Sequence, residues 1–334
     1  MNKFAFLSLF ALMAVSCGAA PNSNPSSSSA DDYQIRWLSP VGAPTLAFYD
    51  QGKNSNWLST DTPQSVIPTA FSSNGYDAIV FDGTSGLNLI SRSGGASHYA
   101  LARWINELPF YLVSVTHNAE EAIPANATID AFVQNGTASQ ALREMAESDW
   151  GIGPLTAVTY EDGVAAVQAN LLRDTSSYDY FVLAEPVYTL TKAALNNRGV
   201  TLNLIKDLQS EWGRYHEGAA IPSAGLFVNT DALSAHPAGL SAFVADVDAR
   251  LDDLVLDPGK VKTTLLAFEE ETGNLASQFG VGLPIINQFD TLQQTNKLGF
   301  LNQDQTKETV REYANKFAAG IGGSAYAENL FVTI

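Results

Sequence analysis

The chain has 334 residues, enough for one large hydrophobic core or two smaller ones, and 46% of them are hydrophobic, as in folded proteins. Asp and Glu outnumber Lys and Arg by 35 to 18, which gives a formal charge of −17. This charge and the lack of any basic cluster exclude nucleic acid and anionic membrane surfaces as partners.

The first 16 residues have the pattern of a signal peptide. Lys3 precedes an apolar run over residues 4–15, which is too short to span a bilayer but suits a signal-peptide core. Ala14-Val15-Ser16-Cys17 resembles the lipobox of bacterial lipoproteins, in which the cysteine is lipidated. The alternative is an ordinary signal peptide followed by a cysteine without a role. Residues 17–32 are rich in Ser, Asn and Pro, so we expect a lipidated tether that does not pack.

The organisation of the chain is clearest at residues 76–86. An apolar strand at residues 78–81 ends in a polar, glycine-rich turn, and the next helix is expected to begin there. Residues 177–186 repeat this order of a polar break, Tyr-Asp, an apolar strand and an acidic residue. Two copies predict two similar α/β lobes that face one cleft.

The remaining segments divide the chain into three parts. The first part of lobe 1 covers residues 33–115, lobe 2 covers residues 116–223, and residues 224–334 return to lobe 1 and end in helices. Strands are expected at residues 35–38, 110–115, 128–133, 156–159, 202–205 and 224–229. Residues 99–108 have helical spacing, and Asp162 is expected to cap a helix that runs to residue 172.

Four loops stand at the ends of predicted strands, and helix N-termini that converge there would supply N–H donors for a polar or anionic group. The alternative is that each loop is only a polar turn. The predicted ligand-binding residues are Ser39, Val41, Gly42, Ala43, Pro44, Thr45, Asp82, Gly83, Thr84, Ser85, Gln134, Asn135, Gly136, Thr137, Glu185 and Tyr188.

Signatures of catalysis are weak, so no catalytic residue, cofactor or metal is predicted. The turn after Asp82 lacks the glycine spacing of a nucleophile elbow. The four histidines, His98, His117, His216 and His236, have no metal-ligand spacing. Asp82 and Glu185 remain open either as an acid/base pair or as hydrogen-bonding residues.

The order of these segments resembles the solute-binding proteins of ABC importers. The segments that carry the resemblance are SPVGAPTLAFYD, YDAIVFDGTSG, TIDAFVQNGTAS, YEDGVAAVQANLL, YDYFVLAEP and PSAGLFVNT, within residues 33–317. The nearest class serves the uptake of nitrate, sulfonate, taurine and thiamine precursors. The resemblance implies the type II periplasmic-binding-protein fold: two α/β lobes with mixed sheets flanked by helices, a two-strand hinge and a cleft that closes on a ligand.

The implied function is transport by a lipid-anchored, extracytoplasmic monomer whose partners are a small ligand and the permease and ATPase subunits. The candidate loops contain no Arg or Lys and two of them carry an acid, so a neutral or cationic ligand is predicted. A heterocycle stacked on Trp57, Phe132 or Tyr188 would fit, unless these aromatics belong to the core. Two alternatives remain: an enzyme of the same fold, of the pyrimidine or menaquinone biosynthesis type, and a surface lipoprotein without a transport role.

Overall fold

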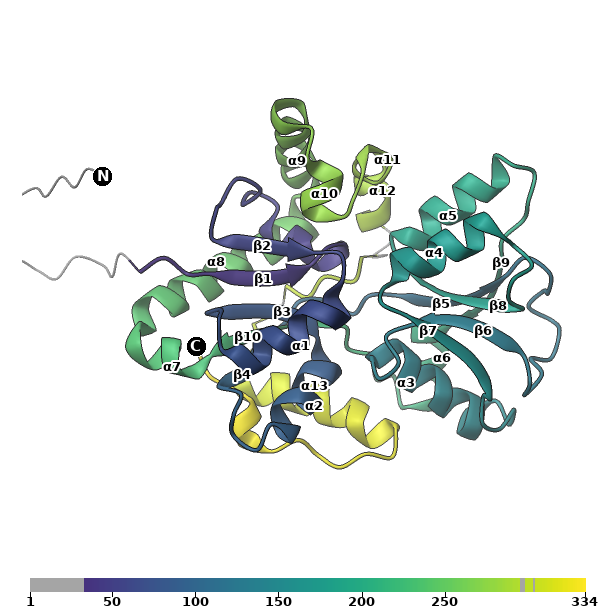
Figure 1. The fold of residues 1–334 in the computed structure, drawn as a ribbon, viewed down its shortest axis with the longest axis horizontal. Helices are drawn as coiled ribbons and strands as arrows, with labels where there is room; N and C mark the ends of the chain where they lie inside the picture. Colours follow the sequence, from purple (N-terminus) through teal and green to yellow (C-terminus); the bar gives the residue numbers. More distant parts are fainter. Residues whose placement is uncertain (1–32, 295–297, 303) are drawn as a thin grey trace, which may run out of the picture.

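The chain forms two α/β lobes that lie side by side (Figure 1). The computed structural model describes residues 33–294, 298–302 and 304–334, so the predicted signal peptide and Cys17 lie outside the described residues. Within those ranges no helix combines the length and hydropathy that a membrane span requires.

Each lobe contains one five-stranded mixed sheet. In the first lobe the order is β2 (Trp57–Thr60), β1 (Trp37–Pro40), β3 (Ala78–Asp82), β10 (Ala224–Asn229) and β4 (Tyr99–Trp104). In the second lobe it is β7 (Ala157–Glu161), β6 (Thr128–Phe132), β8 (Tyr180–Ala184), β5 (Phe110–Ser114) and β9 (Asn203–Asp207). In each sheet one strand, β10 or β5, runs antiparallel to both of its neighbours. The two repeated segments of the sequence, β3 and β8, occupy the central position of their sheets.

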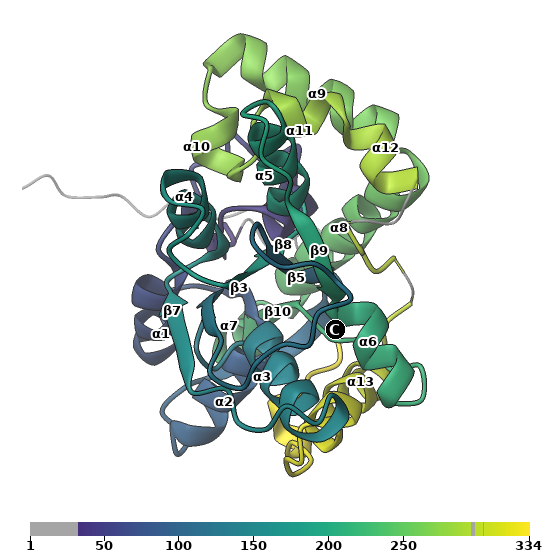
Figure 2. The same cartoon turned by 90° about the vertical axis from the view of Figure 1, so that its right-hand side faces the viewer.

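Helices cover both faces of both sheets. The first lobe carries α1 (Pro63–Ser73), α2 (Gly83–Arg92), α7 (Thr230–Ala235), α8 (Pro237–Leu256), α9 (Pro258–Thr272), α10 (Leu275–Phe279), α11 (Leu283–Asn287), α12 (Phe289–Gln294) and α13 (Lys307–Gly320), with 3₁₀ turns at Ala43–Phe48 and Glu328–Leu330. The second lobe carries α3 (Thr137–Glu144), which continues as a π-helical turn over Met145–Asp149, and α4 (Val164–Arg173), α5 (Val187–Asn196) and α6 (Leu208–Tyr215). Helices α9–α12 extend beyond the edge strand β2 (Figure 1), and Figure 2 shows these four helices together at the top of the view.

The central strand β8 is apolar along its whole length, and β3 is apolar as far as Asp82, because both faces of each sheet are covered. Along β3, Val80 packs into the core under α8, and Phe81 packs into the core under α1 and α2. Along β8, Val182 faces α3 and α6, whereas Leu183 faces α4 and α5. Each lobe therefore has three layers, a sheet between two layers of helices, with one hydrophobic core on each face of the sheet.

The chain crosses between the lobes twice, and the two crossings are hydrogen-bonded to each other. Ile105 N donates to Ala224 O (2.7 Å), and Asn106 accepts from the backbone N–H groups of Ser223 and Ala224 at 3.1 Å each. These few bonds form the hinge between the sheets.

Three expectations from the sequence differ from the structure. Residues 99–104, expected in a helix, form β4, because all six side chains are buried between the layers and pair with β10. The first lobe was expected to extend to residue 115, but β5 belongs to the second sheet. Gly163, and not Asp162, is the N-cap residue of α4, because the Asp162 side chain is bonded to the other lobe.

The glycines after Asp82 serve close packing and do not form an open loop. A Cβ atom at Gly83 would lie 1.9 Å from Cζ3 of Trp104, and one at Gly86 would lie 2.3 Å from Cζ of Phe227. The first turn of α2 can therefore lie against the sheet only because these positions lack side chains.

We predict that Gly83→Ala lowers the free energy of unfolding by about 1–3 kcal/mol through overpacking, although Ala is the better helix former. Urea denaturation measures this change. Gly163→Ala is the matched control, since a Cβ atom there meets nothing within 4 Å. Equal stability of the two variants would contradict the packing described here.

Candidate functional site

A cavity of roughly 170 Å³ lies between the two lobes at the carboxyl ends of β1, β3, β6 and β8. Its walls are mainly apolar and include Phe81 from the first lobe and Phe110 and Phe132 from the second. Four carboxylates, those of Asp61, Asp82, Asp162 and Glu185, also line it. Among the described residues that line the cavity there is no Lys, Arg or His. An apolar chamber with acidic side chains suits a ligand that carries no negative charge.

Asp82 lies at the N-termini of two helices, one from each lobe. Its Oδ1 accepts from the backbone N–H of Ser85 (2.8 Å) and from Oγ1 of Thr84 (3.1 Å), which caps α2. Its Oδ2 accepts from the backbone N–H (3.0 Å) and Oγ1 (2.9 Å) of Thr137, at the first turn of α3. One carboxylate therefore joins the lobes with bonds to both helices.

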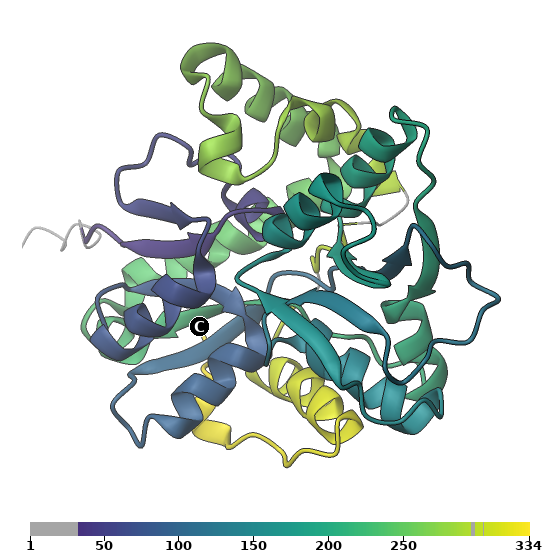
Figure 3. The ribbon, with the colours of Figure 1, turned by 45° about the vertical axis from the view of Figure 1, so that its right-hand side comes forward.

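The neighbouring hydroxyl groups extend this contact across the boundary. Oγ1 of Thr84 and Oγ1 of Thr137 are 2.9 Å apart, and both side chains are buried. Figure 3 shows α2 and α3 next to each other where the lobes meet. The negative charge of Asp82 also reaches Tyr326, whose pKa is raised to about 12, chiefly by burial and in smaller part by this carboxylate.

Asp162 makes a second bridge between the lobes. Its carboxylate, in the turn between β7 and α4, accepts from the backbone N–H of Gln64 (2.9 Å) and from Oγ of Ser65 (3.1 Å). Gln64 and Ser65 are in the first turn of α1, in the other lobe. The side chain expected to cap its own helix therefore caps a helix across the cavity.

Glu185 lies at the end of β8 with 1% of its surface exposed. Its two carboxylate oxygens accept from the backbone N–H (3.2 Å) and Oγ1 (3.0 Å) of Thr189 in the first turn of α5. Burial raises the pKa of Tyr111 well above its ordinary value, and the charge of Glu185 adds to this shift. Asp82 and Glu185 were considered either as an acid/base pair or as hydrogen-bonding residues. In the structure both carboxylates act as hydrogen-bond acceptors for helix N-termini.

The structure brings half of the predicted ligand-binding residues to the cavity. Those that line it are Val41, Gly42, Ala43, Pro44, Asp82, Gly136, Thr137 and Glu185. Those that do not line it are Ser39, Thr45, Gly83, Thr84, Ser85, Gln134, Asn135 and Tyr188.

Several residues of the second group hold the loops in place. Oγ of Ser39 accepts from Nε1 of Trp57 (2.9 Å), and Oγ1 of Thr45 donates to the carbonyl oxygens of Gly42 (2.6 Å) and Phe279 (2.8 Å). Oγ of Ser85 donates to the carbonyl oxygen of Asn135 (3.3 Å) in the other lobe. These side chains position the walls of the cavity.

Of the three aromatics considered for stacking, Phe132 alone lines the cavity. Trp57 is buried against Trp37, Phe48 and Phe279 in the core of the first lobe. Tyr188 packs on Tyr111 with ring centroids 4.5 Å apart. The core interpretation holds for these two residues.

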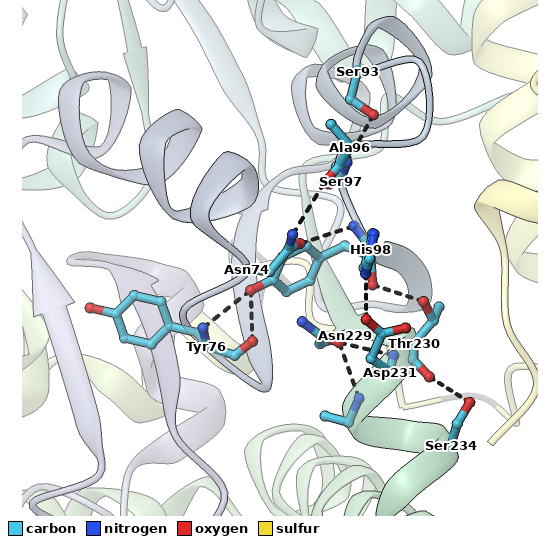
Figure 4. A network of polar contacts seen from close by, with 12 residues as sticks. Asn74, Tyr76, Ser93, Ala96, Ser97, His98, Asn229, Thr230, Asp231 and Ser234 are labelled. Carbon is cyan, nitrogen blue, oxygen red and sulfur yellow. Dashed lines mark hydrogen bonds and ion pairs between the residues drawn. The ribbon is translucent and has the colours of Figure 1, made fainter.

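His98, one of the four histidines named from the sequence, lies in the first lobe at the end of the sheet opposite the cavity. It belongs to a polar network in which Nδ1 pairs with Asp231 and the backbone N–H bonds to Oδ1 of Asn74 (3.0 Å) (Figure 4). Because β3 and β10 are antiparallel, Asn229 of this network and Asp82 stand at opposite ends of the paired strands. His98 has a structural role there.

The sequence interpretation missed four polar cavity residues, Asp61, Gln64, Asp162 and Ser223. The rule that ligands lie past strand ends would have included Asp61, which follows β2, and Asp162, which follows β7. No sequence signal marks Gln64, which enters the cavity because α1 begins beside Asp162.

We predict that Asp162→Ala accelerates hydrogen exchange at the Gln64 amide by about tenfold or more, since a bond to a charged acceptor contributes roughly 1.5–3 kcal/mol. Exchange measured by NMR tests this. Asp61→Ala is the matched control, because it removes a cavity carboxylate that makes no hydrogen bond to the second lobe within the part of the chain that the structure describes. Unchanged protection in Asp162→Ala would show that the bridge does not form.

Neither a family model nor a curated protein matches this chain, but solved structures have a similar fold. An ABC transporter from Parabacteroides distasonis is 16% identical over 89% of this chain and 98% of its own, with a TM-score of 0.58. The periplasmic aliphatic sulphonate-binding protein SsuA from Escherichia coli is 12% identical over 88% and 94%, with a TM-score of 0.56. A Candida albicans protein described as having the generic periplasmic-binding-protein fold is 10% identical over 89% and 93%, with a TM-score of 0.59. The predicted type II periplasmic-binding-protein fold, and the resemblance to ABC solute-binding proteins at the level of the fold, are confirmed.

Proposed function

We propose that the protein is an extracytoplasmic solute-binding lipoprotein of an ABC importer, which closes its two lobes on a small metabolite. The observation that carries the proposal is one cavity built from strand ends of both lobes and bridged by Asp82 and Asp162. A hinge of two crossings allows the lobes to separate, and a permease can read the resulting change of shape. The solved structures of similar fold include proteins described as binding components of ABC-type transporters, which supports this role.

The proposed ligand is a neutral or cationic heterocycle, such as a thiamine or pyrimidine precursor. The carboxylates of the cavity favour a cation or a hydrogen-bond donor and disfavour an anion. Phe132, with its ring centroid 6.1 Å from that of Phe110, offers an aromatic face in the cavity wall. No catalytic role is proposed for Asp82 or Glu185, because their oxygens already accept bonds from helix N-termini.

The proposed location is the outer face of the bacterial cell membrane. Lipidated Cys17 would hold the protein there, residues 17–32 would act as a tether, and the protein would act as a monomer with permease and ATPase subunits as partners. Residues 1–16 would be removed as the signal peptide. The support for this part of the proposal is the lipobox-like sequence.

Thermal denaturation with a panel of neutral heterocycles, cationic heterocycles and small sulfonates tests the proposed ligand class. A ligand at about 100 times its Kd stabilises the folded state by about 2.7 kcal/mol, so we expect the melting midpoint to rise by roughly 5 °C with a neutral or cationic compound. A preference for sulfonates, or turnover of the bound compound, would contradict the proposal.

Two variants connect this response to the cavity. Phe132→Leu keeps an apolar side chain but removes the aromatic face, and it should reduce the ligand-induced shift. Tyr188→Phe changes an aromatic residue outside the cavity and should leave the shift intact.

A further inference from the structure

Asp82 does more than cap its own helix. The capping role needs one acceptor, which Oδ1 supplies to Ser85, and a Ser or Thr at this position would also supply it. The second oxygen reaches across the lobe boundary to the backbone N–H and hydroxyl of Thr137. The capping of α2 does not need Oδ2, and Oδ2 is the oxygen that joins the lobes.

The position of this carboxylate is one that favours a negative charge. The N-termini of α2, with 10 residues, and α3, with eight, point backbone N–H groups and the positive ends of their dipoles toward it. A carboxylate has about four acceptor sites, and Asp82 receives four hydrogen bonds. The backbone N–H groups of Ser85 and Thr137 are thus already paired with the protein.

We propose that the Asp82 carboxylate occupies the position between the two helix N-termini that an acid group of a ligand would otherwise occupy, and that it joins the two lobes in place of such a group. This inference rests on the proposed function in one respect, that the cavity is the ligand site. Asp82 then acts as a specificity-determining residue: it pairs the N–H groups of both helices and repels a second negative charge. The other carboxylates of the cavity, with no cation among its described lining residues, add to this repulsion.

Removing the carboxylate should convert the position into an anion site. Asp82→Gly keeps an acceptable N-cap residue and leaves the N–H groups of Ser85 and Thr137 without their acceptor, with space for a small oxyanion. The probes are sodium acetate and sodium methanesulfonate, compared with sodium chloride at equal ionic strength. We expect the variant to bind them about tenfold or more tightly than the unaltered protein, as measured by calorimetry and by a rise in melting midpoint.

The controls separate this position from the general charge of the cavity. Asp61→Gly removes a carboxylate from the same cavity that makes no hydrogen bond to the described residues, and it should gain no comparable affinity. Asp82→Asn removes the charge but keeps the volume, so it should bind the anions less tightly than Asp82→Gly does. A gain in Asp61→Gly equal to that in Asp82→Gly would overturn the proposal.

Two further outcomes would overturn it. One is a folded Asp82→Gly variant, verified by circular dichroism, that binds acetate and methanesulfonate no better than the unaltered protein does. The other is tight anion binding by the unaltered protein, a result that needs no variant to fold. The experiment uses no metabolite, so a gain of anion binding together with failure of every neutral and cationic compound would sustain this inference and refute the proposed function.

Discussion

The arrangement of the two lobes depends on one kind of interaction, a carboxylate that accepts backbone N–H groups from a helix of the opposite lobe. Asp82 in the first lobe bonds to α3 in the second, and Asp162 in the second bonds to α1 in the first. The bridges run in opposite directions across one cavity. Hydrogen bonds to charged groups contribute roughly 1.5–3 kcal/mol each. Such bridges can therefore bias an equilibrium between open and closed lobes without making closure irreversible.

This arrangement explains why a cavity lined by four acidic residues has mainly apolar walls. The oxygens of Asp82 and Glu185 accept bonds from the first turns of helices, so much of their hydrogen-bonding capacity is met by the protein. The apolar surfaces of the cavity include those of Phe81, Phe110 and Phe132. Under the proposed function, charge would select against anions, and shape and apolar contact would select among the remaining ligands.

The sequence predicted the fold and the position of the cavity better than the contacts of the cavity residues. Apolar strands followed by polar turns identify where helices begin, and this pattern correctly placed the turns after β3 and β6 at the cavity. Which side chain of a turn faces the cavity depends on partners far away in the sequence: Thr45 turns to Phe279, and Asp162 turns to Gln64. Spacing alone also cannot show that β4 is buried on both faces, so its residues looked helical.

The most direct test of the account is small-angle X-ray scattering from the ligand-free protein and from the double variant Asp82→Ala/Asp162→Ala, with Asp61→Ala as the control. If the two carboxylates hold the lobes together, the double variant has a larger radius of gyration, and the control scatters like the unaltered protein. Superimposable profiles for the unaltered protein and a folded double variant would contradict the account.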